Sequence, residues 1–396
     1  MSEDRTGGAP QDPAGVGEVP GTTDIKLIPL DAERAHQPPR PHGWKATASK
    51  ILHFVAAIFL FILAIQLMKA SAAPIGARLK QTGLIDNAVM TLGFGWFGAY
   101  IVLSGSPVAA VALTFFSEGV LTPLQTFTML SGSRLGASFI VLLVGFLYSV
   151  RNKDRQRTIG MGVLALSMTA IVYIPGMMLG YLILREGLLK NIHWQASSEL
   201  TSIIKAVWGP IVDFISRWTP APLLFPIGLA VILVSFKLLD RVLPEIDPER
   251  HAGSKHLWLK KPWPMFGLGC LAALLTLSVS VALTVLVPLA AKGYVKRREA
   301  IPYIAGANIT TLADTLVAAM ITGHPVAVQI VLAEAIAVAL ITVIYLGFFY
   351  KPIVNGIIKL DDWVVETNRR LYMFVVALFL VPAMLVGVGK LIGPVG

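Results

Sequence analysis

Long runs of apolar residues, separated by short charged segments, dominate this sequence. The uninterrupted runs cover residues 51–68, 159–184, 221–239, 326–350 and 371–388. Each is close to the length of about 20 apolar residues that an α-helix needs to cross a bilayer. Each run therefore predicts a membrane-spanning helix.

Two further apolar regions, at about residues 87–150 and 264–324, are interrupted by Gly, Ser, Pro and charged residues. The interruptions fall at residues 103–107, 118–119 and 131–136 in the first region, and at 278–280, 292–299 and 306–315 in the second. Helices that stop inside a membrane are tolerated where the freed backbone is buried in protein or lines a cavity. We therefore expect broken helices in both regions.

The two interrupted regions align without a gap at an offset of 174 residues. Identical residues fall on one another at six positions: Leu103, Ser104, Ser106, Val111, Gly119 and Gly132 match Leu277, Ser278, Ser280, Val285, Gly293 and Gly306. Chance supplies Leu and Val matches in apolar sequence. Two Ser and two Gly at the same spacing indicate an internal repeat.

The positions of Lys and Arg predict how the repeats are oriented. Lys45 and Lys50 precede the first span, which places the N-terminus in the cytoplasm by the positive-inside rule. If each repeat is a re-entrant hairpin that turns at its Ser motif, followed by a helix broken at its Gly motif, then each repeat crosses the membrane once. The basic segment 151–157 then lies in the cytoplasm, whereas two crossings per repeat would place it outside.

The second repeat enters the membrane from the opposite side to the first, so the repeats are inverted. The predicted fold is an all-α polytopic membrane protein with two inverted repeats and additional spanning helices. Residues 1–45 are rich in Pro, Gly and charge and predict a disordered cytoplasmic tail, and residues 46–396 form the transmembrane domain. Residues 200–218 predict an amphipathic interface helix, and the basic segment between 350 and 371 predicts a loop.

Composition supports a membrane protein and removes other classes. The chain is 55% hydrophobic and only 14% charged. A net charge of +10 would suit nucleic-acid binding, but the basic residues lie beside apolar spans, so we expect no nucleic-acid partner. The single Cys270 excludes an intramolecular disulfide. We expect a multi-pass protein of the inner (plasma) membrane, surrounded by lipid.

Polar residues within the apolar regions are the candidate functional site. Asn308, Thr310, Thr311 and Asp314 follow one another at membrane depth, where unsatisfied polar groups cost several kcal/mol. Hydroxyl and amide oxygens suit hard cations such as sodium, and hydroxyl groups also donate to anions. No transition-metal spacing and no nucleophile with a base is visible, so we expect no transition-metal site, no catalytic residues and no enzyme activity.

At these motifs the sequence resembles the type II sodium/phosphate cotransporter family. That family carries a Gln-Ser-Ser-Ser motif in each inverted repeat, followed by Gly-Ala-Asn-Ile-Gly-Thr-Thr. Residues 277–284 and 306–311 are similar to the second copy, and residues 103–106 and 132–137 are similar to a divergent first copy. The resemblance implies a secondary active symporter that moves inorganic phosphate or a similar oxyanion with sodium by alternating access. It implies no other cofactor and suggests a homodimer.

The resemblance also implies most of the site residues: Ser104, Ser106, Ser278, Ser280 and Asn308 for the substrate, and Ser278, Ser280, Asn308, Thr310 and Thr311 for the cation. Arg134 joins the substrate set and Asp314 joins the cation set because of their charge at membrane depth, not because of the resemblance. The chain departs from the family pattern, because Leu103 and Leu277 replace both Gln residues and Gly105 and Val279 replace the middle Ser residues. Arg134 stands where the first repeat should have Asn.

Three charged residues leave alternatives open. Arg134 contacts the anion, replaces one coupling cation, or forms a structural ion pair with Glu118 or Asp314. Asp314 joins a sodium shell, carries a proton or neutralises Arg134. Glu334 is an intramembrane carboxylate that functions in transport or pairs locally. At the level of function, the alternatives are a proton-coupled anion transporter and a non-transporting membrane regulatory or interaction protein.

Overall fold

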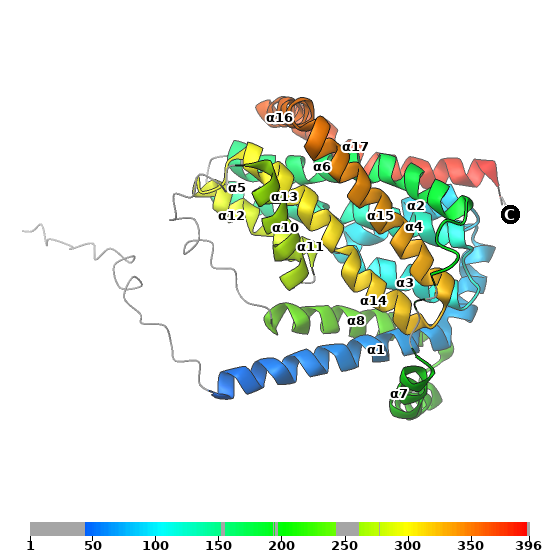
Figure 1. Cartoon of the computed structure of the whole chain (residues 1–396). Helices are drawn as coiled ribbons and strands as arrows, with labels where there is room; N and C mark the ends of the chain where they lie inside the picture. Colours follow the sequence, from blue (N-terminus) through cyan, green and yellow to red (C-terminus); the bar gives the residue numbers. More distant parts are fainter. Residues whose placement is uncertain are drawn as a thin grey trace, which may run out of the picture. The chain divides into compact units, whose positions relative to one another are not determined.

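The computed structural model describes residues 44–151, 155–192, 194, 197–242, 261–276 and 278–393, and every regular element within these ranges is a helix (Figure 1). Residues 48–396 belong to one compact unit. The predicted tail lies outside the described residues except for its last two positions.

Among the described residues, seven helical segments are long and apolar enough to cross a membrane. They are Ala48–Gln81, Pro123–Val150, Gln156–Arg185, Ala221–Leu239, Arg297–Thr322, Pro325–Phe348 and Asn368–Ile392. Five of them contain the uninterrupted runs, whose prediction as long apolar helices is confirmed. The described part of the chain is therefore all-helical, and its long apolar helices indicate a multi-pass membrane protein.

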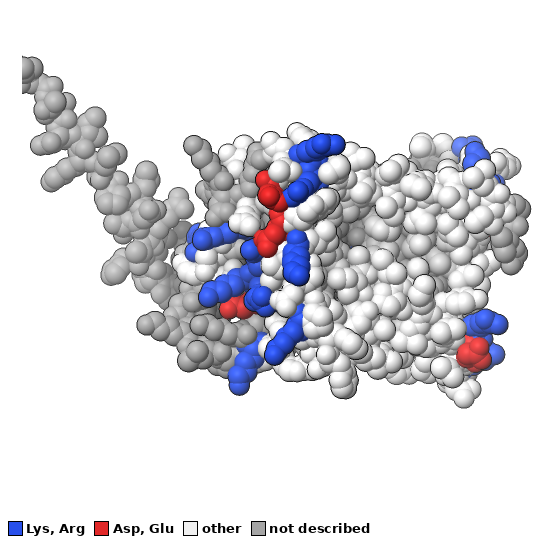
Figure 2. Space-filling view, turned by 90° about the horizontal axis from the view of Figure 1, so that it is seen from above, with Lys and Arg blue, Asp and Glu red and all other residues white. Residues whose placement is uncertain are grey.

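The surface charge has the distribution of a protein that crosses a membrane. Lys and Arg on the visible face gather in a band toward one end, together with several acidic residues (Figure 2). Two smaller charged groups lie at the opposite end, and the broad surface between the two ends is free of charge in this view. An uncharged band of this kind is what the hydrocarbon core of a bilayer requires.

The two interrupted regions contain the same series of helices. In the first they are α2 (Ala88–Val102), α3 (Ser106–Ser117), α4 (Pro123–Ala137) and α5 (Phe139–Arg151). In the second they are α10 (Pro262–Thr276), α11 (Val279–Thr284), α12 (Leu286–Ala291), α13 (Arg297–Thr310) and α14 (Leu312–Thr322). The offset of 174 residues carries α2 onto α10, α3 onto α11 with α12, and α4 onto α13.

Local sequence explains where these helices begin and end. Leu103 adopts a left-handed conformation (φ +56°) that ends α2, and Ser278 caps α11 by accepting a hydrogen bond from the Val281 amide. Gly119 and Gly293, also 174 residues apart, both have positive φ, which glycine adopts without steric penalty. The predicted breaks at the Ser motifs and at these connecting turns are confirmed.

The break predicted within residues 306–315 is confirmed, because α13 ends at Thr310 and α14 begins at Leu312. The break predicted at residues 131–136 comes two residues later, at Ser138. Neither break falls at the glycine itself, since Gly132 and Gly306 both lie inside helices. A Cβ atom on Gly132 would overlap the carbonyl oxygen of Leu92, and one on Gly306 would overlap that of Phe266. Glycine is therefore needed for the close crossing of α2 with α4 and of α10 with α13, rather than for unwinding.

The remaining helices surround these two regions. They are α1 (Trp44–Gln81), α6 (Arg155–Arg185), α7 (Ser198–Trp218), α8 (Ala221–Val242), α15 (Pro325–Phe348), α16 (Tyr350–Glu366) and α17 (Asn368–Ile392). Helix α6 packs against α4, α5, α13 and α15. Helices α7 and α16 lie across the direction shared by α1, α6, α8 and α17 (Figure 1). The structure confirms the predicted helix at 200–218.

The predicted loop between residues 350 and 371 is wrong, because it is largely the amphipathic helix α16. Arg297, at the start of α13, donates to Asp361 (2.7 Å) and Asp362 (2.6 Å) of this helix. Asp362 also accepts a hydrogen bond from Gln156 of α6. The Lys and Arg residues of this segment predicted a loop, but the segment is a helix whose buried face, which includes Asp361, packs against α6 and α13.

We expect Gly306→Ala and Gly132→Ala each to lower the free energy of unfolding by about 1–3 kcal/mol, because the added methyl group forces two helix backbones apart. Thermal unfolding of the purified protein measures this. Gly267→Ala on α10 is the matched control, since a Cβ there meets nothing within 4 Å. Equal stability of the Gly306 and Gly267 variants would contradict a packing role.

Asp361 should give the protein a pH-dependent stability. Burial raises the pKa of this carboxyl from 3.8 to about 6, although its ion pair with Arg297 acts in the opposite direction. The folded protein then binds this proton more tightly than the unfolded chain. The contribution of Asp361 to the free energy of unfolding therefore falls as pH rises from about 4 to 6, and it is constant above that range. In Asp361→Asn this contribution disappears, so the difference in melting temperature between variant and wild type should change only within that window. A constant difference across pH would refute the assignment.

Candidate functional site

Arg134 of α4 is the centre of the candidate site. Its side chain is buried, with 2% of the residue exposed. One terminal nitrogen, Nη1, donates to Thr311 Oγ1 (3.2 Å) and Ser106 Oγ (3.5 Å), and the other, Nη2, donates to Thr315 Oγ1. Three hydroxyl groups, one from the start of α3 and two from residues 311–315, therefore surround the guanidinium group.

Asp314 of α14 is the carboxylate nearest to Arg134. Its Oδ1 atom lies 3.8 Å from Nη2 of Arg134 and accepts a hydrogen bond from the Thr315 hydroxyl at 2.9 Å. Glu118, the other partner considered for Arg134, instead lies 3.6 Å from Lys69 at a more exposed position. The structure therefore selects Asp314 as the counter-ion and makes pairing with Glu118 wrong.

Glu334 of α15 is a second acidic residue in this region. It has no exposed surface, and neither of its carboxylate oxygens has a hydrogen-bond partner among the described residues. It interacts electrostatically with Arg134. Ser131 of α4 is the local polar neighbour of Glu334, but its hydroxyl donates to the carbonyl of Phe127 within its own helix.

Asn308 lies in a neighbouring polar group. Its Nδ2 atom donates to Thr169 Oγ1 (2.9 Å), which is 2.7 Å from the hydroxyl of Ser138 at the break between α4 and α5. Its backbone carbonyl accepts from the hydroxyl of Tyr173 at 2.9 Å. Tyr173 interacts electrostatically with Arg134, Glu334 and Asp314. The polar group around Asn308 therefore adjoins the one around Arg134. Asn308 occupies the position in the second repeat that Arg134 occupies in the first.

The Ser motifs of the two repeats contact each other. Of their serines, Ser106 also contacts Arg134. The Ser280 hydroxyl donates to the carbonyl of Leu103 (3.4 Å), so the turns of the two repeats touch. Ser278 caps its own helix, and the Thr310 hydroxyl bonds back to Gly306 of its own helix. Ser104 lies half-buried at the first turn.

The structure thus brings Ser106, Arg134, Thr311 and Asp314 together, with Asn308 adjacent. Ser104, Ser278, Ser280 and Thr310 lie outside the direct contacts of Arg134. Sequence reasoning missed Thr315, Thr169 and Tyr173. Thr315 carries a usable signal, because it follows Asp314 and lies one helical turn beyond Thr311. The other two lie on α6, outside the repeats, where nothing in the sequence indicates which residues face Asn308.

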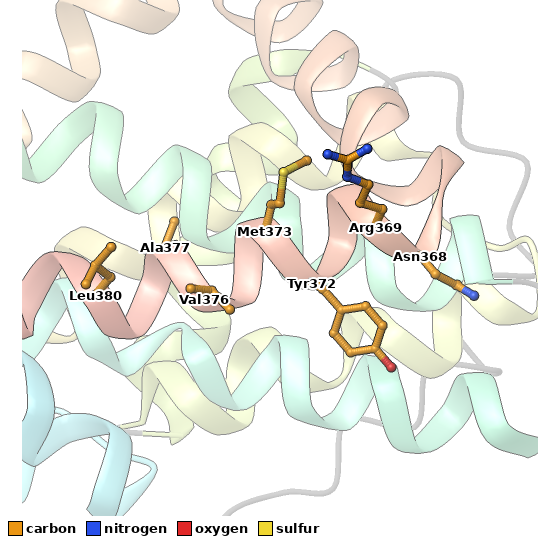
Figure 3. Close-up of a pocket in the computed structure, with 7 residues that line it drawn as sticks. All are labelled: Asn368, Arg369, Tyr372, Met373, Val376, Ala377 and Leu380. Carbon is orange, nitrogen blue, oxygen red and sulfur yellow. The ribbon is translucent and has the colours of Figure 1, made fainter.

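The arrangement suits ion binding more than covalent chemistry. A guanidinium group surrounded by hydroxyls matches an oxyanion, and the two carboxylates match a proton or a cation. No group of three or more metal-ligating side chains occurs within the described residues. A pocket on the outer face of α17 is lined mainly by apolar side chains and by Asn368 and Arg369 (Figure 3). It shares no residue with the buried polar groups.

Comparison of the chain with protein-family models, with curated proteins and with solved structures gave no match.

Arg134→Met should lower the free energy of unfolding by about 3–5 kcal/mol, because it leaves the charge of Asp314 buried without its partner. The double variant Arg134→Met, Asp314→Asn should recover part of this loss, since it removes both charges of the pair. Chemical denaturation of the purified variants measures both effects. If the double variant is less stable than either single variant, the ion pair does not account for the structure around Arg134.

Proposed function

We propose that the chain is a secondary active symporter that carries inorganic phosphate or a similar oxyanion together with a cation. The observation that carries the proposal is Arg134, a fully buried arginine surrounded by hydroxyl donors near the middle of its candidate span. Intramembrane charges of this kind mark substrate and ion pathways. The guanidinium fork binds two oxygens of an oxyanion at once, and the Ser and Thr hydroxyls add further donors.

The proposed architecture is a pair of inverted repeats. It is supported by the matched helix series at an offset of 174 residues and by the hydrogen bond from Ser280 to Leu103, which joins the two turns. In this arrangement α2 with α3, and α10 with α11 and α12, are re-entrant hairpins, and α4–α5 and α13–α14 are the single crossings. Positive-inside orientation then gives a cytoplasmic N-terminus in the plasma membrane. The family resemblance suggests that two copies associate.

The coupling cation has two candidates. Sodium follows from the resemblance and would use hydroxyl and amide oxygens of Ser278, Ser280, Asn308, Thr310 and Thr311. A proton is favoured by the two buried carboxylates, Asp314 and Glu334. In both cases the cation offsets the negative charge of the carboxylates beside Arg134. Without the cation, that negative charge would oppose an incoming anion.

The contacts support an exchange of partners during transport. Asp314 occupies one side of the guanidinium group at 3.8 Å, and an oxyanion would take over this charge interaction. Binding of a cation weakens the hold of the carboxylates on Arg134. The two repeats can then move relative to each other around an anion that is held between α3, α4 and α14, which is alternating access.

Uptake into proteoliposomes tests the proposal. Labelled phosphate, or a related oxyanion such as sulfate, should accumulate when an inward sodium gradient or an inward proton gradient is imposed. Arg134→Gln should reduce the initial rate by at least about tenfold, whereas Arg185→Gln, at the exposed end of α6, should leave it unchanged.

Absence of oxyanion flux under both gradients, in protein that is folded and correctly inserted, would refute the proposal. It would favour a membrane regulatory or interaction protein that shares the fold.

A further inference from the structure

The buried region around Arg134 contains one positive and two negative side chains. Asp314 is the counter-ion, because it lies 3.8 Å from Arg134 and shares the Thr315 hydroxyl. Glu334 is therefore in excess. An unpaired buried carboxylate is strongly disfavoured when it is ionised, and it becomes neutral instead.

The helices that pack against α15 contribute few charged or titratable groups toward Glu334. They are Arg134 from α4 and Tyr173 from α6, and Asp314 of α14 contacts Arg134. Helix α3 has no charged side chain, the charged residues of α13 lie in its first turn, and α16 begins only beyond the C-terminal end of α15. Arg134 is the one positive charge of this group, and its terminal nitrogens already contact Asp314 and three hydroxyls.

The surroundings of Glu334 fit a proton better than sodium. Sodium needs a shell of several oxygen ligands, but the carboxylate oxygens of Glu334 have no hydrogen-bond partner among the described residues. The hydroxyl of Ser131, on α4, neighbours Glu334 but donates to the carbonyl of Phe127 in its own helix, and one hydroxyl is not a sodium shell. The neighbours of Glu334 on α15 are fully buried apolar residues, Ile330, Val331, Ala333, Ala337 and Val338. A protonated carboxyl group is neutral and needs no such shell.

We propose that Glu334 is the proton-binding site of this protein, and that Asp314 serves as the fixed counter-ion of Arg134. Release of the proton from Glu334 leaves a second anion beside Arg134, which opposes the binding of an oxyanion. Uptake of the proton removes that charge and favours oxyanion binding. Proton and oxyanion are therefore expected to bind together. This last step rests on the proposed transport function, whereas proton binding itself does not.

Infrared spectroscopy of the reconstituted protein tests proton binding directly. A protonated carboxylic acid has a carbonyl stretch that is separate from the amide and carboxylate bands. Wild type should show a buried band of this kind that disappears as pH is raised. Glu334→Gln should lack it, and Glu366→Gln, which removes an exposed acid with 64% of its side chain accessible, should retain it.

Two further variants keep the test decisive if Glu334→Gln does not fold. Glu334→Asp keeps an acid at this position in an altered environment, so the band should titrate at a different pH. Asp314→Asn frees Arg134 to pair with Glu334, so the band should weaken. A band that persists unchanged in Glu334→Asp and Asp314→Asn would overturn the assignment, as would its survival in folded Glu334→Gln.

Transport separates this inference from the proposed function. An inward proton gradient should accelerate oxyanion uptake in the wild type. In Glu334→Gln, the increase in uptake rate that the gradient causes should be about tenfold smaller. If a sodium gradient alone drives uptake and no band titrates, the proton site is refuted and the symporter stands. If the band titrates but no oxyanion moves, the proton site stands and the symporter is refuted.

Discussion

A buried arginine needs negative charge and hydrogen-bond acceptors, and this requirement organises the centre of the molecule. Arg134 obtains them from residues distant in sequence, namely Ser106 of the first region and Thr311, Asp314 and Thr315 of the second. Removing one charge of such a buried pair is strongly destabilising, because the other charge is left buried without a partner. The two regions are therefore held together by an interaction that neither satisfies alone.

The corresponding position in the second region is Asn308, which carries no charge and hydrogen-bonds to Thr169 of α6. Equivalent positions in the two regions thus have different chemistry, although the helices follow one another in the same order. One half of the centre is electrostatic, and the other is a network of neutral hydrogen bonds. The two halves therefore differ in charge as well as in hydrogen bonding.

Much of the fold was predictable, because apolar length and turn residues act locally. The long apolar helices, the helix ends at the Ser motifs and the repeat offset all follow from residues within a few positions of each break. The function of Gly132 and Gly306 was not predictable, since it depends on Leu92 and Phe266, whose carbonyls approach from another helix. Helix α16 was missed for a different reason: its apolar residues Val354, Ile357 and Val364 repeat at helical spacing, but the basic residues of the segment favoured a loop.

The site was predictable as a set of polar residues but not as a geometry. Sequence left Arg134 with two possible counter-ions and Glu334 with an unspecified local partner. Which carboxylate reaches the guanidinium depends on how α14 and α15 pack against α4, and no local pattern encodes that packing. Tyr173 and Thr169 were missed because they lie on a helix outside the repeats.

The glycine crossings have a mechanical consequence. Where the backbones of α2 and α4, or of α10 and α13, approach without intervening side chains, the two helices cannot slide past each other without steric overlap. Each crossing therefore fixes the position of its two helices relative to each other. The break between α13 and α14 at Thr311 lies outside the glycine crossings and contacts Arg134, so any change in the path of these two helices would act directly on the guanidinium group.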